Sequence, residues 1–337
     1  MTSFVIRRLL QVLPTVFVAL SALFFIFFLL PGDPAQLIAG GAERTIDPGV
    51  LDTIERRYGL NDPLHEQFFN YWKRTLQWDL GDSYISRASV NEILGERAIN
   101  SLRLAAWGMI IEVFVGLSVG VLSAVRRYSW SDRATTVATA AAAAVPAFVL
   151  GFLLQYFWAV LPGPNKWEFP EWMQLRTSGI GPDTWTFFFV PVGEQWRYLV
   201  LPALTLACVN TALLTRMTRG SMLEVLGADY IRTARSKGMR ERDVIVRHGL
   251  RNAMMPAITL IGIDIGTTIG VAVLTETTFS WPGLGSRIVE AVSDRDLPVL
   301  LGLSLVVVLV YVLANMAVDI SYAWFDPRVR HARAGKT

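Results

Sequence analysis

The sequence predicts an all-α membrane protein with about six transmembrane helices. Of its 337 residues, 53% are hydrophobic and only 18% are charged, whereas a soluble domain has about 25% charged residues. The hydrophobic residues are concentrated in blocks of roughly 20, the length that an α-helix needs to cross a bilayer. The blocks cover residues 9–30, 102–125, 134–161, 198–217, 257–278 and 299–324.

The first block resembles a signal peptide because Arg7 and Arg8 precede it. However, it is about twice as long as the usual hydrophobic region of such a peptide. Pro31-Gly32-Asp33-Pro34 follows it, in place of a small-residue cleavage pattern. We therefore expect residues 1–30 to be retained as the N-terminal segment and first transmembrane helix. In the third block, Pro146 predicts a kink.

Lys and Arg residues predict how the chain is oriented. The loop after the second block contains Arg126, Arg127 and Arg133; the loop after the fourth contains Arg219, Arg232, Arg235, Lys237, Arg240, Arg242, Arg247 and Arg251; the C-terminal tail contains Arg328, Arg330, Arg333 and Lys336. Short loops rich in these residues lie on the cytoplasmic side. Both termini are then cytoplasmic, in agreement with an even number of spans. Topology accounts for the net charge of +3, so we do not expect a nucleic-acid partner.

Residues 31–100 lie outside the cytoplasm in this topology, and two helices are expected in them. Asp47-Pro48 and Asp62-Pro63 are helix start signals, and Tyr58-Gly59 is a stop. A small helical extracytoplasmic domain is predicted, with an ordered loop as the alternative. The chain then divides into residues 1–30, the extracytoplasmic domain 31–100, a membrane core at 101–325 with its cytoplasmic loop 219–256, and a cytoplasmic tail at 326–337.

The loop 219–256 contains the most informative pattern. Lys237 and Gly238 form a good helix stop, because a cation in the last turn precedes a residue that tolerates the left-handed conformation. A short helix is expected before them and a second helical segment after them. A short helix that projects from a membrane bundle can pass force from a soluble partner into the membrane-spanning helices.

The same loop resembles the EAA loop of the inner-membrane permeases of binding-protein-dependent ABC importers, in the dipeptide, oligopeptide and nickel branch. Thr233, Ala234 and Gly238 occupy the positions of that motif's two small residues and glycine, and Arg232 replaces the glutamate of the wider family. The matching residues are Asp229-Tyr230, Arg232-Thr233-Ala234-Arg235, Lys237-Gly238, Arg247-His248, Leu250-Arg251-Asn252-Ala253 and Pro256. Further stretches that look like this branch run from Arg7-Arg8-Leu9-Leu10 to Asp326-Pro327-Arg328, so the resemblance covers nearly the whole chain.

The resemblance implies a type I ABC importer permease fold in a bacterial inner membrane. The short helix would be a coupling helix that contacts a cytoplasmic ATPase through Asp229, Tyr230, Arg232, Thr233, Ala234, Arg235, Lys237 and Gly238. The implied partners are a second, similar permease in a heterodimer, two ATPase subunits or one fused ATPase, and an extracytoplasmic binding protein. ATP and Mg²⁺ would bind the ATPases, and this chain would bind no cofactor. The alternative is that the basic residues only orient the loop.

The fifth hydrophobic block contains polar and small residues in a helical pattern. Gly262, Gly266 and Gly270 recur every fourth residue and predict a face that packs closely on another helix. Asp264, Thr267 and Thr268 project roughly opposite and are predicted to line the translocation path. The alternative is that Asp264 lies near enough to the cytoplasmic surface to be solvated or paired with a loop arginine. Glu112 and Asn210, in other blocks, either line the cavity or join helices.

Glu276, Phe279 and Trp281 follow at the outer end of this block, where the resemblance suggests an outer gate and the alternative is an interfacial anchor. His65, His248 and His331 are scattered, so no metal site is expected. A Walker-A loop is also missing from the sequence. We therefore expect a transport subunit and not an enzyme.

The alternatives from other classes are a secondary transporter or channel and an intramembrane enzyme. The first should show inverted repeats or charges at the bilayer midplane, and Asp264 alone is thin support for it. The second needs paired catalytic groups at one depth, which the sequence does not indicate. For an importer permease, peptides are the expected cargo, with nickel chelates as the runner-up and glutathione or another small solute as further alternatives.

Overall fold

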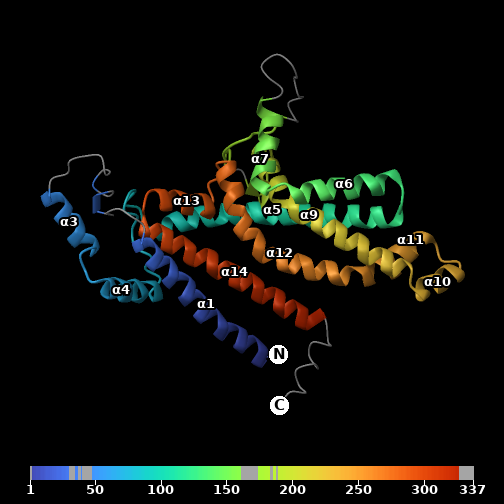
Figure 1. The fold of residues 1–337 in the computed structure, drawn as a ribbon, viewed down its shortest axis with the longest axis horizontal. Coiled ribbons are helices and arrows are strands. Elements are labelled where there is room, and N and C mark those ends of the chain that lie inside the picture. The colour runs from blue at the N-terminus through green and yellow to red at the C-terminus, as the bar shows by residue number, and fades with distance from the viewer. Residues whose placement is uncertain are drawn as a thin grey trace. The chain divides into compact units, whose positions relative to one another are not determined.

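The structure is a computed structural model that describes residues 2–29, 35–36, 39, 48–160, 174–182, 185–186 and 189–325. The described residues are mostly helical (Figure 1). The helices are α1 (Thr2–Leu29), α3 (Pro48–Tyr58), α4 (Leu64–Leu76), α5 (Val90–Val125), α6 (Trp130–Ala144), α7 (Ala147–Gln155), α9 (Gln195–Leu226), α10 (Asp229–Ser236), α11 (Glu241–Asp243), α12 (Arg251–Thr278), α13 (Leu284–Ser293) and α14 (Leu297–Phe325). Two π-helical segments, η1 (Tyr156–Val160) and η3 (Val244–Leu250), and an antiparallel strand pair, β1 (Trp185–Thr186) and β2 (Val190–Pro191), complete the description.

All six predicted spans correspond to helices. Three segments are long and apolar enough to cross a membrane unaided: Val90–Val125, Gln195–Leu226 and Leu297–Met316. Two bent pairs, Trp130–Ala144 with Ala147–Ala159 and Glu241–Thr268 with Gly270–Thr278, each pass the same test together. The sixth is α1, with a shorter apolar stretch at Leu10–Ile26. The expected all-α, multi-pass architecture is confirmed.

The predicted kink in the third span is a bend of 105° between α6 and α7. Val145 takes an extended conformation, with φ −97° and ψ 127°. The ring of Pro146 excludes the helical conformation at the residue before it and removes one N–H donor from the helix. The span is therefore two helices, where the sequence predicted one kinked helix.

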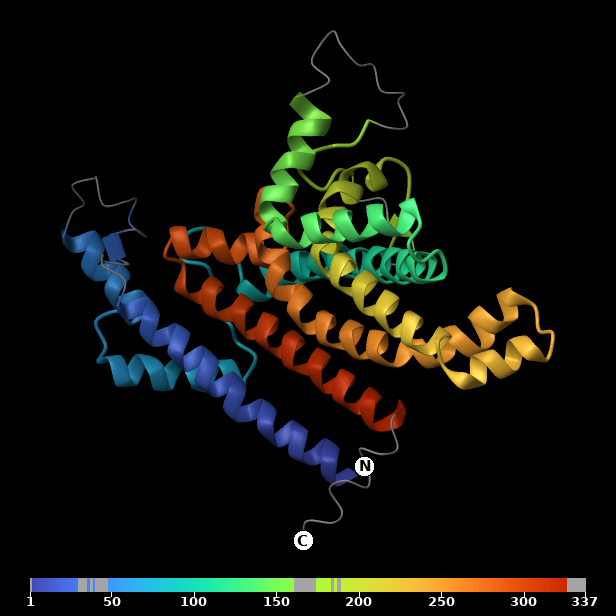
Figure 2. The ribbon, with the colours of Figure 1, turned by 45° about the vertical axis from the view of Figure 1, so that its right-hand side comes forward.

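The chain divides into two compact units, and the first comprises residues 1–100 and 283–313. In this unit α1 and α14 lie side by side (Figures 1 and 2). Phe24 of α1 packs against Phe68 and Tyr71 of α4, with ring centroids 5.4 and 5.6 Å apart. The predicted starts and stop of the two outer helices agree with α3, which ends at Tyr58, and α4, which begins after Pro63.

Residues 48–100 do not form a core of their own in this unit. Their apolar side chains join one cluster with α1, α13 and α14, because two short helices bury too little apolar surface to be stable alone. Asp296, which is fully buried, connects the segment at residues 83–84 with Arg287 of α13. Its carboxylate accepts hydrogen bonds from the Ser83 hydroxyl at 2.5 Å and from the Tyr84 N–H at 3.0 Å. Arg287 Nη2 lies 3.6 Å from Asp296 Oδ2. The turn predicted at residues 31–34, Asp47 and the tail 326–337 lie outside the described residues.

The second unit comprises residues 101–282 and 314–337, and close packing of α5 on α9 dominates it. A Cβ atom added to Gly108, Gly116 or Gly120 of α5 would lie 2.9, 2.8 or 2.7 Å from Leu206, Leu214 or Thr218 of α9, respectively. The partners advance together along both helices, so α5 and α9 run parallel. Their C-terminal ends therefore lie at the same end of the pair, as the predicted topology requires of the loops that follow them.

This packing predicts that Gly120→Ala destabilises the protein. Its Cβ would lie 2.7 Å from Thr218 Cβ and 2.9 Å from the Thr215 carbonyl oxygen, and a backbone atom cannot move aside cheaply. We expect a loss of about 1–3 kcal/mol, seen as a lower melting temperature of the detergent-solubilised protein.

Gly220→Ala in α9 is the matched control, since no atom lies within 4 Å of its added Cβ. It should leave the melting temperature unchanged or raise it slightly, because alanine favours helix. Equal effects of the two substitutions would contradict the close packing.

Candidate functional site

The short helix predicted in the loop 219–256 is α10. Ala228 precedes it in an extended conformation, and Asp229 places an acidic side chain in the first turn, where the helix dipole favours it. At the other end, Gly238 has φ +73°, a conformation that glycine adopts without strain. The predicted helix and its sharp turn are confirmed, and in Figure 1 α10 lies beyond the end of α9.

One face of α10 is buried and the other is exposed. Ile231 and Ala234 form a cluster with Val244 of η3 and are 0% and 7% exposed. The other residues predicted for the ATPase contact are exposed: Asp229, Tyr230, Arg232, Thr233, Arg235, Lys237 and Gly238. Ala234 therefore belongs to the support of the helix and not to its exposed surface, because the small side chain lets η3 approach.

Polar contacts also hold α10 in place. Arg235 donates two hydrogen bonds, of 3.1 and 2.7 Å, to the carboxylate of Glu241 in α11. This carboxylate raises the pKa of the Arg235 guanidinium, so the arginine is charged at any physiological pH. The Asn252 amide of α12 donates to the Tyr230 hydroxyl at 2.9 Å. Because α10 contacts α11, η3 and α12, it cannot shift without moving the helices that follow it.

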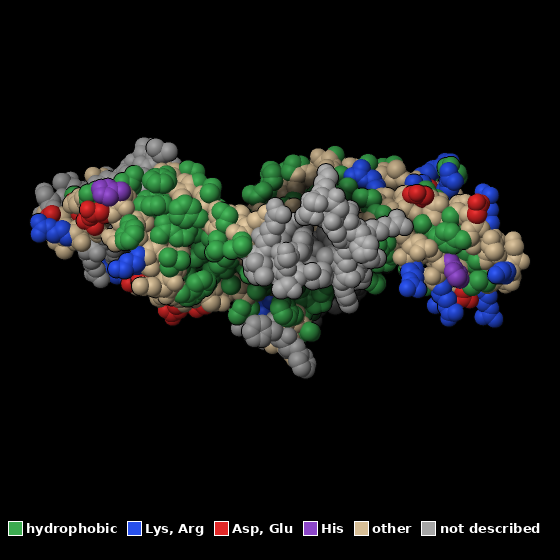
Figure 3. All heavy atoms as spheres, turned by 90° about the horizontal axis from the view of Figure 1, so that it is seen from below, with side chains coloured by type: hydrophobic (Ala, Val, Ile, Leu, Met, Phe, Trp, Pro, Cys, Tyr) green, Lys and Arg blue, Asp and Glu red, His purple; other side chains and the backbone are tan. Residues whose placement is uncertain are grey.

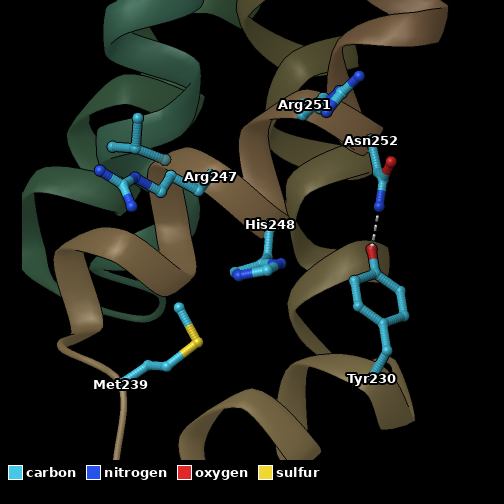
Figure 4. A pocket seen from close by; sticks show the side chains of 7 residues that line it. Tyr230, Met239, Arg247, His248, Arg251 and Asn252 are labelled. Atoms are coloured by element: carbon cyan, nitrogen blue, oxygen red, sulfur yellow. Dashed lines mark hydrogen bonds between the residues drawn. The ribbon is translucent and has the colours of Figure 1, made fainter.

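A groove of about 880 Å³ opens beside Tyr230 (Figure 4). Its lining is Tyr230, Met239, Val246, Arg247, His248, Arg251 and Asn252. Figure 3 shows Lys and Arg side chains gathered around the α10 and η3 end of the second unit. The sequence identified Arg247 and Arg251 as orientation signals and as part of the motif resemblance, but not as the lining of a groove. Since nearby positive charges attract an acidic partner, the groove is a candidate extension of the α10 contact surface.

A buried ion pair ties three helices together at this end of α9. Asp132 of α6, with its side chain 4% exposed, accepts from Arg219 Nε at 2.7 Å and Nη2 at 2.9 Å. It also accepts from the Ser123 hydroxyl of α5 at 2.5 Å. Sequence reasoning missed this site because Asp132 and Arg219 lie in different loops, and it assigned Arg219 to orientation alone.

The structure rearranges the two faces predicted for α12. Gly266 is buried against Asn315 of α14, whose side chain lies 2.8 Å from the added Cβ, and Gly262 is also buried. Gly270 instead has open space around it. Residues four apart drift around a helix by about 40° per step, and a bend of 56° intervenes before Gly270. The smooth face therefore covers Gly262 and Gly266 only.

The polar residues predicted opposite the glycines are also divided. Asp264 and Thr268 are 5% and 2% exposed, whereas Thr267 is exposed. Both threonine hydroxyls donate to the Asp264 carbonyl, at 3.3 and 2.6 Å. Buried side chains do not line an open passage, so in this structure only Thr267 of the three is available to one.

Asp264 is joined to other membrane-spanning helices. Its carboxyl group lies within hydrogen-bonding distance of Glu112 in α5, which also contacts Asn210 in α9. In this structure Asp264 is buried beside Glu112, and it is neither solvated nor ion-paired with a described arginine. Glu112 and Asn210 join helices, a choice that the sequence left open.

The three residues suggested for an outer gate are buried in the second unit. Glu276, Phe279 and Trp281 are 1%, 0% and 0% exposed. Glu276 accepts a hydrogen bond from the Ser101 hydroxyl at 2.5 Å, and Gly151 packs on the ring of Phe279. The three side chains are therefore part of the packed interior in this arrangement of the helices, and their role as an outer gate stays a prediction. Within the described residues, no group of three or more His, Cys, Asp and Glu side chains could hold a metal ion.

Comparison with known proteins identifies the family of the chain. Residues 116–331 match the family described as binding-protein-dependent transport system inner membrane component, and residues 1–105 match the N-terminal family of such membrane components. The glutathione transport system permease proteins GsiC of Salmonella typhi and Escherichia coli (strain K12) are 37% and 36% identical to the chain over 331 residues, 98% of this chain and 100% of each relative. This multi-pass chain therefore belongs to the inner-membrane permeases of binding-protein-dependent ABC importers, in their peptide and nickel branch.

Proposed function

We propose that this chain forms half of the translocation path of an importer of short peptides and couples that path to ATPases through α10. The observation that carries the proposal is the packing of α10. One face of this helix is exposed, and the other packs on the segments that lead into the membrane-spanning helices. A partner that moves the exposed face therefore moves the spans.

The contacts of α10 and η3 provide a route by which a movement of α10 reaches the membrane-spanning helices. The buried face of α10 packs on η3, which continues directly into α12, and Tyr230 is hydrogen-bonded to Asn252 in the first turn of α12. Gly249 of η3 in turn packs against Leu226 at the end of α9, 3.4 Å from the added Cβ. A displacement of α10 would reach α9 and α12 together, as rigid-body switching between inward-open and outward-open states requires.

We assign the translocation path to the exposed stripe of α12. Ile263 and Leu274 are 50% and 51% exposed, and Thr267 and Gly270 lie between them at helical spacing. A surface with a hydroxyl and an open glycine suits either a passage or a second permease. Of the three residues that the sequence suggested for the path, Asp264, Thr267 and Thr268, Thr267 keeps this role in the proposal.

The remaining parts of the assembly follow from the family. The proposed partners are a second permease in a heterodimer, ATPase subunits that bind ATP and Mg²⁺, and an extracytoplasmic binding protein that contacts residues 48–100. The α10 loop and both termini would then be cytoplasmic. The chain itself would provide no catalytic group.

The relatives' names bear on the cargo. They are glutathione permeases, and glutathione is a tripeptide, so their cargo falls within the class of short peptides. We propose short peptides, glutathione among them, as the cargo of this chain. A nickel chelate is the second candidate because it belongs to the same branch.

The coupling assignment predicts that Thr233→Arg weakens ATPase binding without unfolding the permease. Thr233 is exposed, and its hydroxyl bonds only to the Asp229 carbonyl of its own helix. A bulky cation there should lower the affinity for the ATPase at least about tenfold, measured by titrating the purified ATPase against the detergent-solubilised permease.

Thr53→Arg is the matched control. Thr53 is an exposed helical threonine with the same bond to the carbonyl four residues earlier, but it lies in α3. It should leave ATPase affinity unchanged. If the ATPase binds the Thr233→Arg permease as tightly as it binds the unaltered one, the α10 contact is refuted.

The cargo proposal predicts that the complete importer accumulates labelled glutathione or dipeptides in proteoliposomes when ATP and the binding protein are supplied. Unlabelled short peptides should compete, whereas a nickel chelate should not. Uptake of the nickel chelate with no competition by peptides would replace the peptide assignment and leave the ATP-driven mechanism intact.

A further inference from the structure

Two buried carboxyl groups meet in the interior of the second unit. Glu112 and Asp264 are 1% and 5% exposed. Glu112 lies about 20 Å along α5 from Val125, where the second predicted span ends, and Asp264 lies about 10 Å along α12 from Ala257, where the fifth begins. Both groups therefore lie within predicted membrane-spanning segments, where the hydrocarbon core is about 30 Å thick.

The two groups lie within hydrogen-bonding distance of each other. Asn210 of α9 is the one other side chain in the described residues that hydrogen-bonds to Glu112. Glu112 Oε1 and Asp264 Oδ2 are buried and accept no hydrogen bond from any described residue. A carboxylate only accepts hydrogen bonds, so two ionised groups would offer each other no donor.

No cation in the described part of the chain compensates for two negative charges here. Along α9, Arg216 is exposed and Arg219 is paired with Asp132. The adjacent α7 contributes no titratable side chain, Cys208 of α9 is half-buried and uncharged, and α14 presents Asn315 to α12 at Gly266. Two carboxylates in contact repel each other strongly where the dielectric constant is low.

We propose that Glu112 and Asp264 hold one proton between them, and that this shared proton is a lock that joins α5 and α12 beside Asn210 of α9. One carboxyl group is then an acid that donates its O–H to the other, which supplies the missing donor and removes one of the two charges. Any movement that separates α5 from α12 must break this bond and leave a buried carboxylate without a donor. The lock therefore favours the arrangement of helices seen here, whatever the cargo.

Infrared spectroscopy of the solubilised permease tests the shared proton directly. A protonated carboxyl group has a C=O stretching band that is resolved from carboxylate bands. We expect such a band at neutral pH, and we expect its loss in both Glu112→Gln and Asp264→Asn, because either substitution removes the partner that retains the proton. Glu92→Gln, which alters an exposed glutamate, should leave the band unchanged.

The pH dependence of the melting temperature is a second test of the shared proton. Raising the pH removes the proton from the unaltered permease and leaves two facing carboxylates, so its melting temperature should fall. Glu112→Gln can donate an amide N–H to Asp264 at any pH, so its melting temperature should change little over that range. The proposal is overturned if the band is missing in the unaltered protein, if it persists in both variants, or if Na⁺ and not pH sets the stability.

Discussion

The close parallel packing of α5 on α9 is the contact on which the rest of the second unit depends. Three glycines bring the helices near enough for Glu112 to meet Asn210 between two of the glycine contacts. The same alignment brings Ser123 and Arg219 to the two sides of Asp132. Where the driving force between helices is packing and hydrogen bonding, a Cβ at the glycines would separate these polar partners as well as the backbones.

Polar side chains in this unit join helices that are distant in the sequence. Asp132 links α5, α6 and α9, and Asp264 links α5 and α12. Both carboxyl groups are buried and have lost contact with water, so each needs a polar partner in the protein. Such contacts join defined pairs of side chains. They suit a protein that changes between a few defined arrangements of its helices.

The α10 loop has the opposite character, with an exposed polar face on a small apolar support. Its residues contact one another through Ile231, Ala234 and Val244, through Arg235 and Glu241, and through Tyr230 and Asn252. The exposed ion pair adds only about 0.2–1 kcal/mol to stability, but its two parallel hydrogen bonds fix the angle of α10. The geometry of the loop is therefore set within the chain before any partner binds.

The sequence alone determined the helical class, the multi-pass architecture, the short α10 helix and the family, because these depend on hydrophobic block length and on local signals such as Lys237-Gly238. It also located Pro146 as a kink in the third span, but not the bend of 105° that divides the span into two helices. Only the tertiary structure decided which residues face inward. Gly270 is exposed while Gly266 is buried, Ala234 supports α10, and Phe279 and Trp281 are core residues. A repeat every fourth residue drifts around a helix, and pairs such as Asp132 with Arg219 or Glu112 with Asp264 form only when distant segments are packed together.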